Sequence, residues 1–97
     1  MKQCDSLQEL RKEVDRIDEQ IVELIAKRNA YIKQAAKFKT SIEDVKSPDR
    51  IEEVMQNGRK KAIELGVNPN MIEDLFKIMI DEMVETEIAE FRNGGNF

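Results

Sequence analysis

The chain contains no histidine, no tryptophan and a single cysteine among its 97 residues. Without histidine it lacks the commonest general base, any Ser-His or Cys-His nucleophile pair and the usual zinc ligand. Cys4 has no second cysteine to form an intramolecular disulfide, and it lies in a lead-in segment that we expect to be disordered. No Asp-rich loop with a central glycine is present, so we expect no metal and no cofactor.

Long apolar runs are also missing. No stretch approaches the roughly 18 residues of a membrane span, and the N-terminus lacks the apolar region of a signal peptide. The net charge of −4 argues against nucleic acid as a partner. We therefore expect a cytoplasmic protein with no membrane or nucleic-acid partner. If it is an enzyme, its reaction needs neither a metal nor a strong base.

The residues that are abundant favour long helices. Charged residues make up 37% of the chain, and there are only four glycines and two prolines. We predict one all-α domain over residues 1–97, with a core of about 6–92, made of one long and two shorter helices. Ser6 with Glu9 forms a capping box that starts the first helix, which then runs to about Thr40. Residues 40–46 lose the periodicity and are predicted to be a connector.

Proline and glycine mark the other two helices. Ser47-Pro48 predicts an N-cap followed by proline at the first helical position, and Gly66 ends this second helix. Asn68-Pro69 repeats the start signal for a third helix that continues to about Phe91. The tail from Asn93 to Asn96 is expected to fray.

The first helix carries a heptad series with one charged member. Its apolar positions are Leu7, Leu10, Val14, Ile17, Ile21, Leu24, Tyr31, Ala35 and Phe38. Position 28 belongs to this series but is arginine, and Lys39 lies eleven residues later, within about 20° of the same face. A guanidinium in a packed seam needs an anion, so the pair indicates an anion-binding site. The structural alternative is that Arg28 reaches the helix edge or pairs with a carboxylate.

The length of the first helix predicts a second chain. The two shorter helices span only about 27 Å and 34 Å, against roughly 50 Å for the first. We expect a two-fold intertwined dimer in which the long helices cover each other, with a monomeric three-helix bundle as the alternative. Such a dimer allows an arginine of one chain to enter the site of the other.

Several segments together resemble the all-helical chorismate mutase family. The segments are Leu10-Arg11, Val14-Asp15-Arg16-Ile17-Asp18, Leu24-Ile25-Ala26-Lys27-Arg28, Ala35-Ala36-Lys37-Phe38-Lys39, Ser47-Pro48-Asp49-Arg50 and Leu75-Phe76 through Glu87. The resemblance covers roughly residues 7–91. It implies an intertwined homodimer with shared active sites that converts the dianion chorismate to prephenate by a Claisen rearrangement. Such a reaction needs only fixed cations in a dry cavity.

The resemblance also implies roles for particular residues. Arg28 and the partner chain's Arg11 would clamp carboxylates, and Lys39 would donate to a carboxylate and to the ether oxygen. Arg50 would close the site, and Glu87 takes the place of a glutamine that donates to the ether oxygen. The expected catalytic residues are Lys39, Glu87 and Arg28, and the expected substrate-binding residues are Arg11, Arg28, Lys39, Arg50, Ser47, Ile51, Met83 and Glu87.

Structural alternatives exist for these side chains. Arg11 has Asp15 at i+4 and could form an ordinary surface ion pair. Lys39 could simply complement the dipole of the helix end, and Glu87 could pair with a core arginine.

Position 51 departs from the mutase pattern. Family mutases commonly have glutamate directly after the second-helix arginine, where this chain has Ile51. The related isochorismate-pyruvate lyases resemble this chain more closely there, so lyase activity is the main alternative. A non-catalytic helical dimer is a lesser one, because all four cations, Arg11, Arg28, Lys39 and Arg50, are present. We favour the mutase.

Overall fold

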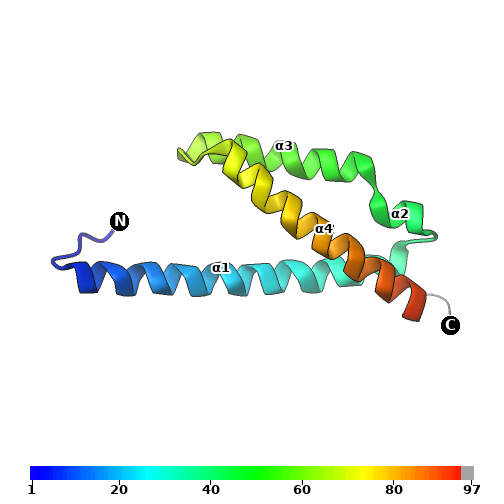
Figure 1. The fold of residues 1–97 in the computed structure, drawn as a ribbon, viewed down its shortest axis with the longest axis horizontal. Helices are drawn as coiled ribbons and strands as arrows, with labels where there is room; N and C mark the ends of the chain where they lie inside the picture. Colours follow the sequence, from blue (N-terminus) through cyan, green and yellow to red (C-terminus); the bar gives the residue numbers. More distant parts are fainter. Residues whose placement is uncertain (95–97) are drawn as a thin grey trace. The chain divides into compact units, whose positions relative to one another are not determined.

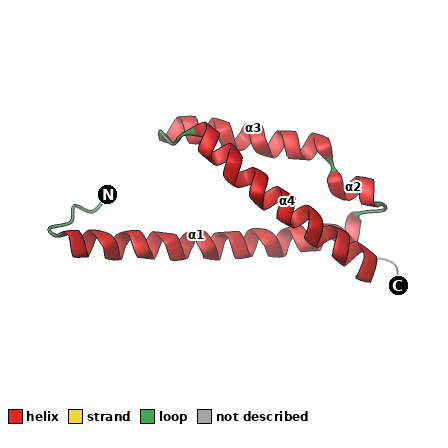
Figure 2. Ribbon diagram, in the orientation of Figure 1, coloured by secondary structure: helices red, strands yellow, loops and turns green. Residues whose placement is uncertain are grey.

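The computed structural model describes residues 1–94, and every regular element in that range is helical (Figures 1 and 2). The elements are α1 (Leu7–Ala35), the 3₁₀ turn η1 (Ala36–Phe38), α2 (Ile42–Lys46), α3 (Pro48–Leu65) and α4 (Pro69–Gly94). The all-α prediction is confirmed. The chain divides into two compact units, Met1–Tyr31 and Ile32–Phe97. A single domain over 1–97 stays a prediction.

The first unit is the N-terminal segment with most of α1. The Ser6 hydroxyl accepts a hydrogen bond from the backbone N–H of Glu9 at 3.1 Å, as the capping box predicts. The Glu9 carboxylate reaches back to the N–H of Asp5 at 3.0 Å, one residue before the expected Ser6. Lys2 forms ion pairs with Glu9 at 3.0 Å and Glu13 at 3.4 Å. These contacts hold the lead-in against α1, where we had expected disorder.

The apolar seam of α1 is largely uncovered. No residue of this helix is buried. The exposed large hydrophobic residues on it are Leu7, Leu10, Val14, Ile17, Ile21, Val22, Leu24 and Tyr31. So much apolar surface along one helix is a recognised mark of a protein–protein contact.

The segment after α1 differs from the prediction in two ways. The helix ends at Ala35 and tightens into η1 before Thr40, and residues 42–46 form the short helix α2 in place of a connector. The Ser41 hydroxyl caps α2 by accepting from the N–H of Asp44 at 3.2 Å. The Asp44 carboxylate in turn accepts from the N–H of Thr40 at 3.0 Å. This local capping stabilises a helix too short to show a periodicity.

The two prolines and Gly66 bound α3 and the start of α4 as predicted. Pro48 is at the first position of α3. Gly66 ends it with a left-handed φ of 73°, and the N–H of Val67 donates to the Ala62 carbonyl at 2.8 Å. The Asn68 side chain accepts from the N–H of Asn70 at 2.9 Å as α4 begins.

Two predictions about helix ends were wrong. The Ser47 side chain makes no capping hydrogen bond to α3. Helix α4 continues through Asn93 and Gly94, so the expected fraying does not begin at Asn93. The rest of that predicted tail, Gly95 and Asn96, lies outside the described residues.

Helices α3 and α4 form a hairpin that organises the second unit (Figure 1). Gly58 permits their close approach, because a Cβ atom there would lie 3.2 Å from the ring of Phe76. Near the turn, Arg59 of α3 pairs with Glu73 of α4 at 2.8 Å. The buried apolar residues are Val45, Ala62, Ile80 and Met83. None of the helices within residues 1–94 is long and apolar enough to cross a membrane.

Candidate active site

Lys39 lies in the connector between η1 and α2 and is half-buried. Its Nζ donates to the main-chain carbonyl of Asp44 at 3.3 Å and to the hydroxyl of Ser47 at 3.4 Å. The Ser47 hydroxyl itself donates to the same Asp44 carbonyl. The segment 39–47 therefore folds back on itself and holds the ammonium group at the C-terminal end of α2.

Glu87 is the one buried charged residue among the described part of the chain, with 8% of its surface exposed. Met83 and Ile80 precede it by one and two turns on the same face of α4, and both are also buried. The sequence prediction that Glu87 continues an apolar stripe is confirmed. Its Oε2 atom is buried and has no hydrogen-bond partner within residues 1–94.

The protonation of Glu87 is set by two opposing effects. Burial raises the pKa of its carboxyl by penalising the charged form, and the positive charge of Lys39 lowers it. Burial is the larger effect, so the pKa lies above its ordinary value. The influence of Lys39 also shows that the two side chains share one electrostatic environment. The site thus combines a fixed cation with a carboxyl group whose raised pKa keeps the neutral, hydrogen-bond-donating form to higher pH than for an exposed glutamate.

Arg50 and Ile51 lie at the start of α3. Arg50 is exposed and forms an ion pair with Glu53 one turn later on the helix surface. Ile51 is half-buried. The structure therefore brings Lys39, Ser47 and Glu87 into one region, whereas the described contacts of Arg50 are with its own helix.

The remaining two predicted cations belong to the first unit. Arg28 is half-buried, in contrast to the exposed Leu24 and Tyr31 on either side of it in the heptad series. Arg11 is exposed, and the surface ion pair with Asp15 that could have explained it does not form among the described residues. The structure therefore does not support a purely structural role for Arg11 through an ion pair with Asp15.

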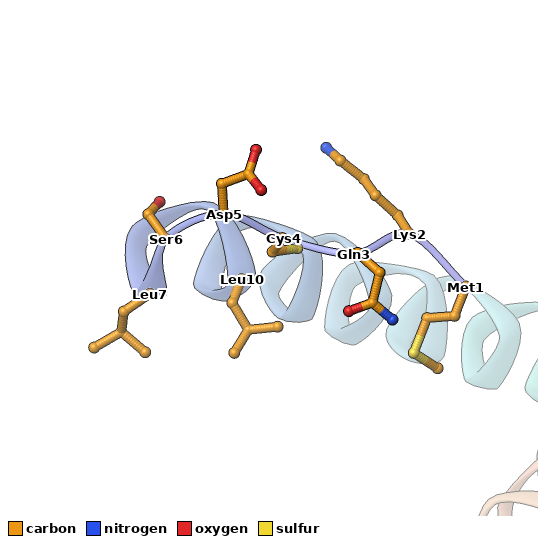
Figure 3. Close-up of a pocket in the computed structure, with 8 residues that line it drawn as sticks. All are labelled: Met1, Lys2, Gln3, Cys4, Asp5, Ser6, Leu7 and Leu10. Atoms are coloured by element: carbon orange, nitrogen blue, oxygen red, sulfur yellow. The ribbon is translucent and has the colours of Figure 1, made fainter.

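An open pocket at the N-terminus has a different lining (Figure 3). Its walls are the residues of the lead-in and the first turns of α1: Met1, Lys2, Gln3, Cys4, Asp5, Ser6, Leu7 and Leu10. None of the predicted site residues is among them. Cys4 is a half-buried free thiol there.

The main-chain carbonyl of Asp44 is the part of the site that sequence reasoning missed. A backbone acceptor carries no side-chain signal, although one indirect sign was available. The carbonyl of residue 44 would normally accept from the N–H of residue 48, which is proline and has none. No cluster of three or more potential metal-binding side chains occurs in the described range 1–94. The expectation of no metal stays a prediction.

Comparison with known proteins identifies the family. The chain matches the chorismate mutase type II family over residues 10–88. It belongs to that family. It is 30% identical to an isochorismate pyruvate lyase of Pseudomonas aeruginosa over 92% of this chain and 88% of the relative. It is 33% identical to a chorismate mutase of Methanocaldococcus jannaschii, over 79% of each chain.

A further relative is a longer protein. The T-protein of Haemophilus influenzae is 29% identical over 86% of this chain, which covers 22% of the T-protein. Membership of the chorismate mutase type II family accounts for the helical fold and confirms the resemblance drawn from the sequence. The names of these relatives include chorismate mutase and isochorismate pyruvate lyase, which are the two activities that the sequence left open.

Proposed function

We propose that this chain is a chorismate mutase, which rearranges chorismate to prephenate. The observation that carries the proposal is a held Lys39 ammonium near enough to the buried Glu87 carboxyl to act on its pKa, in a member of this family. The rearrangement is unimolecular: an ether C–O bond breaks as a C–C bond forms in the same molecule, and no group leaves. The protein has only to fold the substrate and stabilise charge on the ether oxygen.

Lys39 and Glu87 divide that work by their chemistry. An ammonium donates to a carboxylate or to the ether oxygen in any state of the reaction. A neutral carboxyl at Glu87 donates one hydrogen bond, whereas a carboxylate would repel the charge that develops on the oxygen. The raised pKa of Glu87 widens the pH range over which this donating form is present. Met83 lies one turn before Glu87 on the same buried face and lines the site with apolar surface.

The arginines complete the proposed clamp. Arg28 and the partner chain's Arg11 bind the two carboxylates, Arg50 closes the site from α3, and Ser47 and Ile51 lie beside it. For Arg50 this requires release from Glu53, a surface pair that costs little to break. A dianion offers Arg50 a stronger partner than Glu53 does.

A homodimer is part of the proposal. The uncovered heptad seam of α1 supports it, because leaving so many large side chains in water costs about 25 cal/mol for each Å² of apolar surface. A second copy of the same helix is the complementary surface that a two-fold dimer supplies. The cytoplasmic location expected from the sequence stays a prediction.

Isochorismate-pyruvate lyase is the second candidate. Ile51, which stands where family mutases commonly have glutamate, is half-buried, and the lyase relative matches nearly the full chain. The lyase reaction is also pericyclic and would use the same cations. It yields salicylate and pyruvate from isochorismate.

Product analysis separates the candidates. We would incubate the purified chain with chorismate and with isochorismate in separate reactions and identify the products by chromatography. Prephenate as the main product, formed at the higher kcat/KM, supports the mutase. Salicylate and pyruvate formed faster from isochorismate would make the chain a lyase. If neither substrate gave a product, the non-catalytic helical dimer would be the remaining candidate.

A further inference from the structure

The Asp44 carbonyl is an acceptor that the helix itself cannot satisfy. In a continuing helix it would bind the N–H of residue 48, but Pro48 has no N–H. Two side chains take its place: the Ser47 hydroxyl donates to it, and Lys39 Nζ donates to it at 3.3 Å. Lys39 also donates to the Ser47 oxygen at 3.4 Å. The Lys39 ammonium, the Ser47 hydroxyl and the Asp44 carbonyl are thus joined in a closed ring of three hydrogen bonds.

Within this arrangement, Ser47 has an unusual backbone conformation. Its φ of 29° and ψ of 66° lie on the left-handed side of conformational space, which residues with a Cβ atom rarely adopt. It is the one non-glycine residue with positive φ in the described part of the chain. It also makes no capping hydrogen bond to α3, the role that serine usually has before a helix. Backbone strain of this kind often accompanies a functional constraint.

We propose that Ser47 is a positioning residue for Lys39, and this rests on the proposed function of Lys39 as a substrate-binding cation. An ammonium group has three N–H donors. Ser47 and the Asp44 carbonyl accept two of them, which fixes the rotation of the group and leaves one for the substrate. Lys39 in this arrangement donates to a carboxylate or to the ether oxygen, and not to both as the resemblance implies. The single proton of the Ser47 hydroxyl is already donated to Asp44. Ser47 therefore acts through Lys39 and does not donate to the substrate.

Three single variants separate the hydroxyl from the backbone. Ser47→Ala removes the hydroxyl and keeps the strain, and Ser47→Gly removes the hydroxyl and relieves the strain. Ser41→Ala is the matched control: it removes a hydroxyl at the other end of α2 that caps Asp44 N–H and does not contact Lys39. We expect both Ser47 variants to lose on the order of 10-fold in kcat/KM for chorismate, with Ser41→Ala within about threefold of wild type. Ser47→Gly should be at least as thermally stable as wild type.

A double-mutant cycle with Lys39→Met tests whether Ser47 acts through Lys39. In that background the further change Ser47→Gly should leave the residual kcat/KM within about twofold, because the group being positioned is absent. Full activity of Ser47→Gly, or the same 10-fold loss with and without Lys39, would overturn the proposal.

A readout without substrate keeps this proposal distinct from the proposed function. In NMR spectra of the ¹⁵N-labelled chain at low temperature, we expect the Lys39 ammonium signal to be visible in wild type and in Ser41→Ala. It should be lost through faster proton exchange in Ser47→Gly. An unchanged signal in Ser47→Gly overturns the positioning role. A signal that behaves as expected in a chain that converts neither chorismate nor isochorismate would contradict the proposed function and support the positioning.

Discussion

Single side chains account for the chemistry proposed for this protein, and Arg28 is the first of them. A charged residue in an apolar series costs stability unless it is paired, and it contributes little net stability even when it is. Arg28 is half-buried between exposed members of the same series. A residue kept at such a position for binding should be dispensable for folding.

We therefore expect Arg28→Leu to separate activity from stability. Turnover of chorismate should fall on the order of 10²–10³-fold, as for the loss of one preorganised donor. The thermal midpoint should hold or rise, since leucine completes the seam. Both quantities are measured on the same preparation. A large loss of stability with turnover intact would show that Arg28 is structural.

Glu87 predicts a pH dependence of activity. Burial raises the pKa of its carboxyl despite the opposing effect of Lys39, and the protonated form is the one that donates. The kcat/KM of wild type should fall as pH rises through that pKa. Glu87→Gln carries a permanent donor and should flatten the profile, with its largest gain at neutral pH and above. Profiles from about pH 5 to 8 that coincide for the two proteins would exclude this role.

The same carboxyl links pH to stability. Because its pKa is raised on folding, it contributes stability below the pKa of the unfolded chain, and that contribution is lost as pH rises through the folded value. Glu87→Gln should therefore stabilise the protein more at pH 8 than at pH 5. Urea midpoints at the two values measure this. An equal effect at both would mean that Glu87 titrates alike in the folded and unfolded chains.

At the scale of elements, the sequence signals were strongest where a residue type restricts the backbone. Pro48, Pro69 and Gly66 set three helix boundaries as predicted. Helix α2 was missed because five residues show no periodicity and its stability comes from the side chains of Ser41 and Asp44. Heptad positions correctly indicated the apolar face of α1 but not its end at Ala35, where the backbone tightens without a breaking residue.

The site was predictable to a similar degree. Arg28 and Lys39 could be named from their positions on the apolar face of the first helix, whereas the roles of Arg11, Arg50 and Glu87 came from the resemblance. The burial of Glu87 agrees with its place on an apolar stripe of α4. The contacts of Lys39 could not be predicted from the sequence, since one acceptor is a main-chain carbonyl and the other is a serine with an unusual φ. Arg50 was placed in the site from the resemblance alone, and its pairing with Glu53 was not foreseen.

Gly66 offers a test of the α3–α4 hairpin. Its φ of 73° is unfavourable for any residue with a Cβ atom. Gly66→Ala should lower stability by about 1 kcal/mol, or roughly 4–8 °C in Tm for a chain of this size. Gly66→Asn is the control, because asparagine tolerates this conformation and should cost less. Equal Tm values for wild type and Gly66→Ala would contradict the left-handed cap.

At the scale of the whole molecule, the account depends on a second chain. The seam of α1 is exposed along its length, and the cations proposed for one site are divided between α1 and the segments after it. A dimer in which Arg11 of one chain completes the site of the other explains both features. It also explains why Arg11 makes no ion pair within the described part of its own chain.

Refolding of mixed chains tests this central claim most directly. Arg11→Ala and Arg28→Ala chains should each be inactive toward chorismate. Unfolded and refolded together in equal amounts, about half of the dimers will be mixed, each with one intact site, so activity should approach roughly a quarter of wild type. No recovery, with mixed dimers confirmed by mass spectrometry, would contradict the shared site and show that both arginines of one chain serve the same site or that Arg11 serves none.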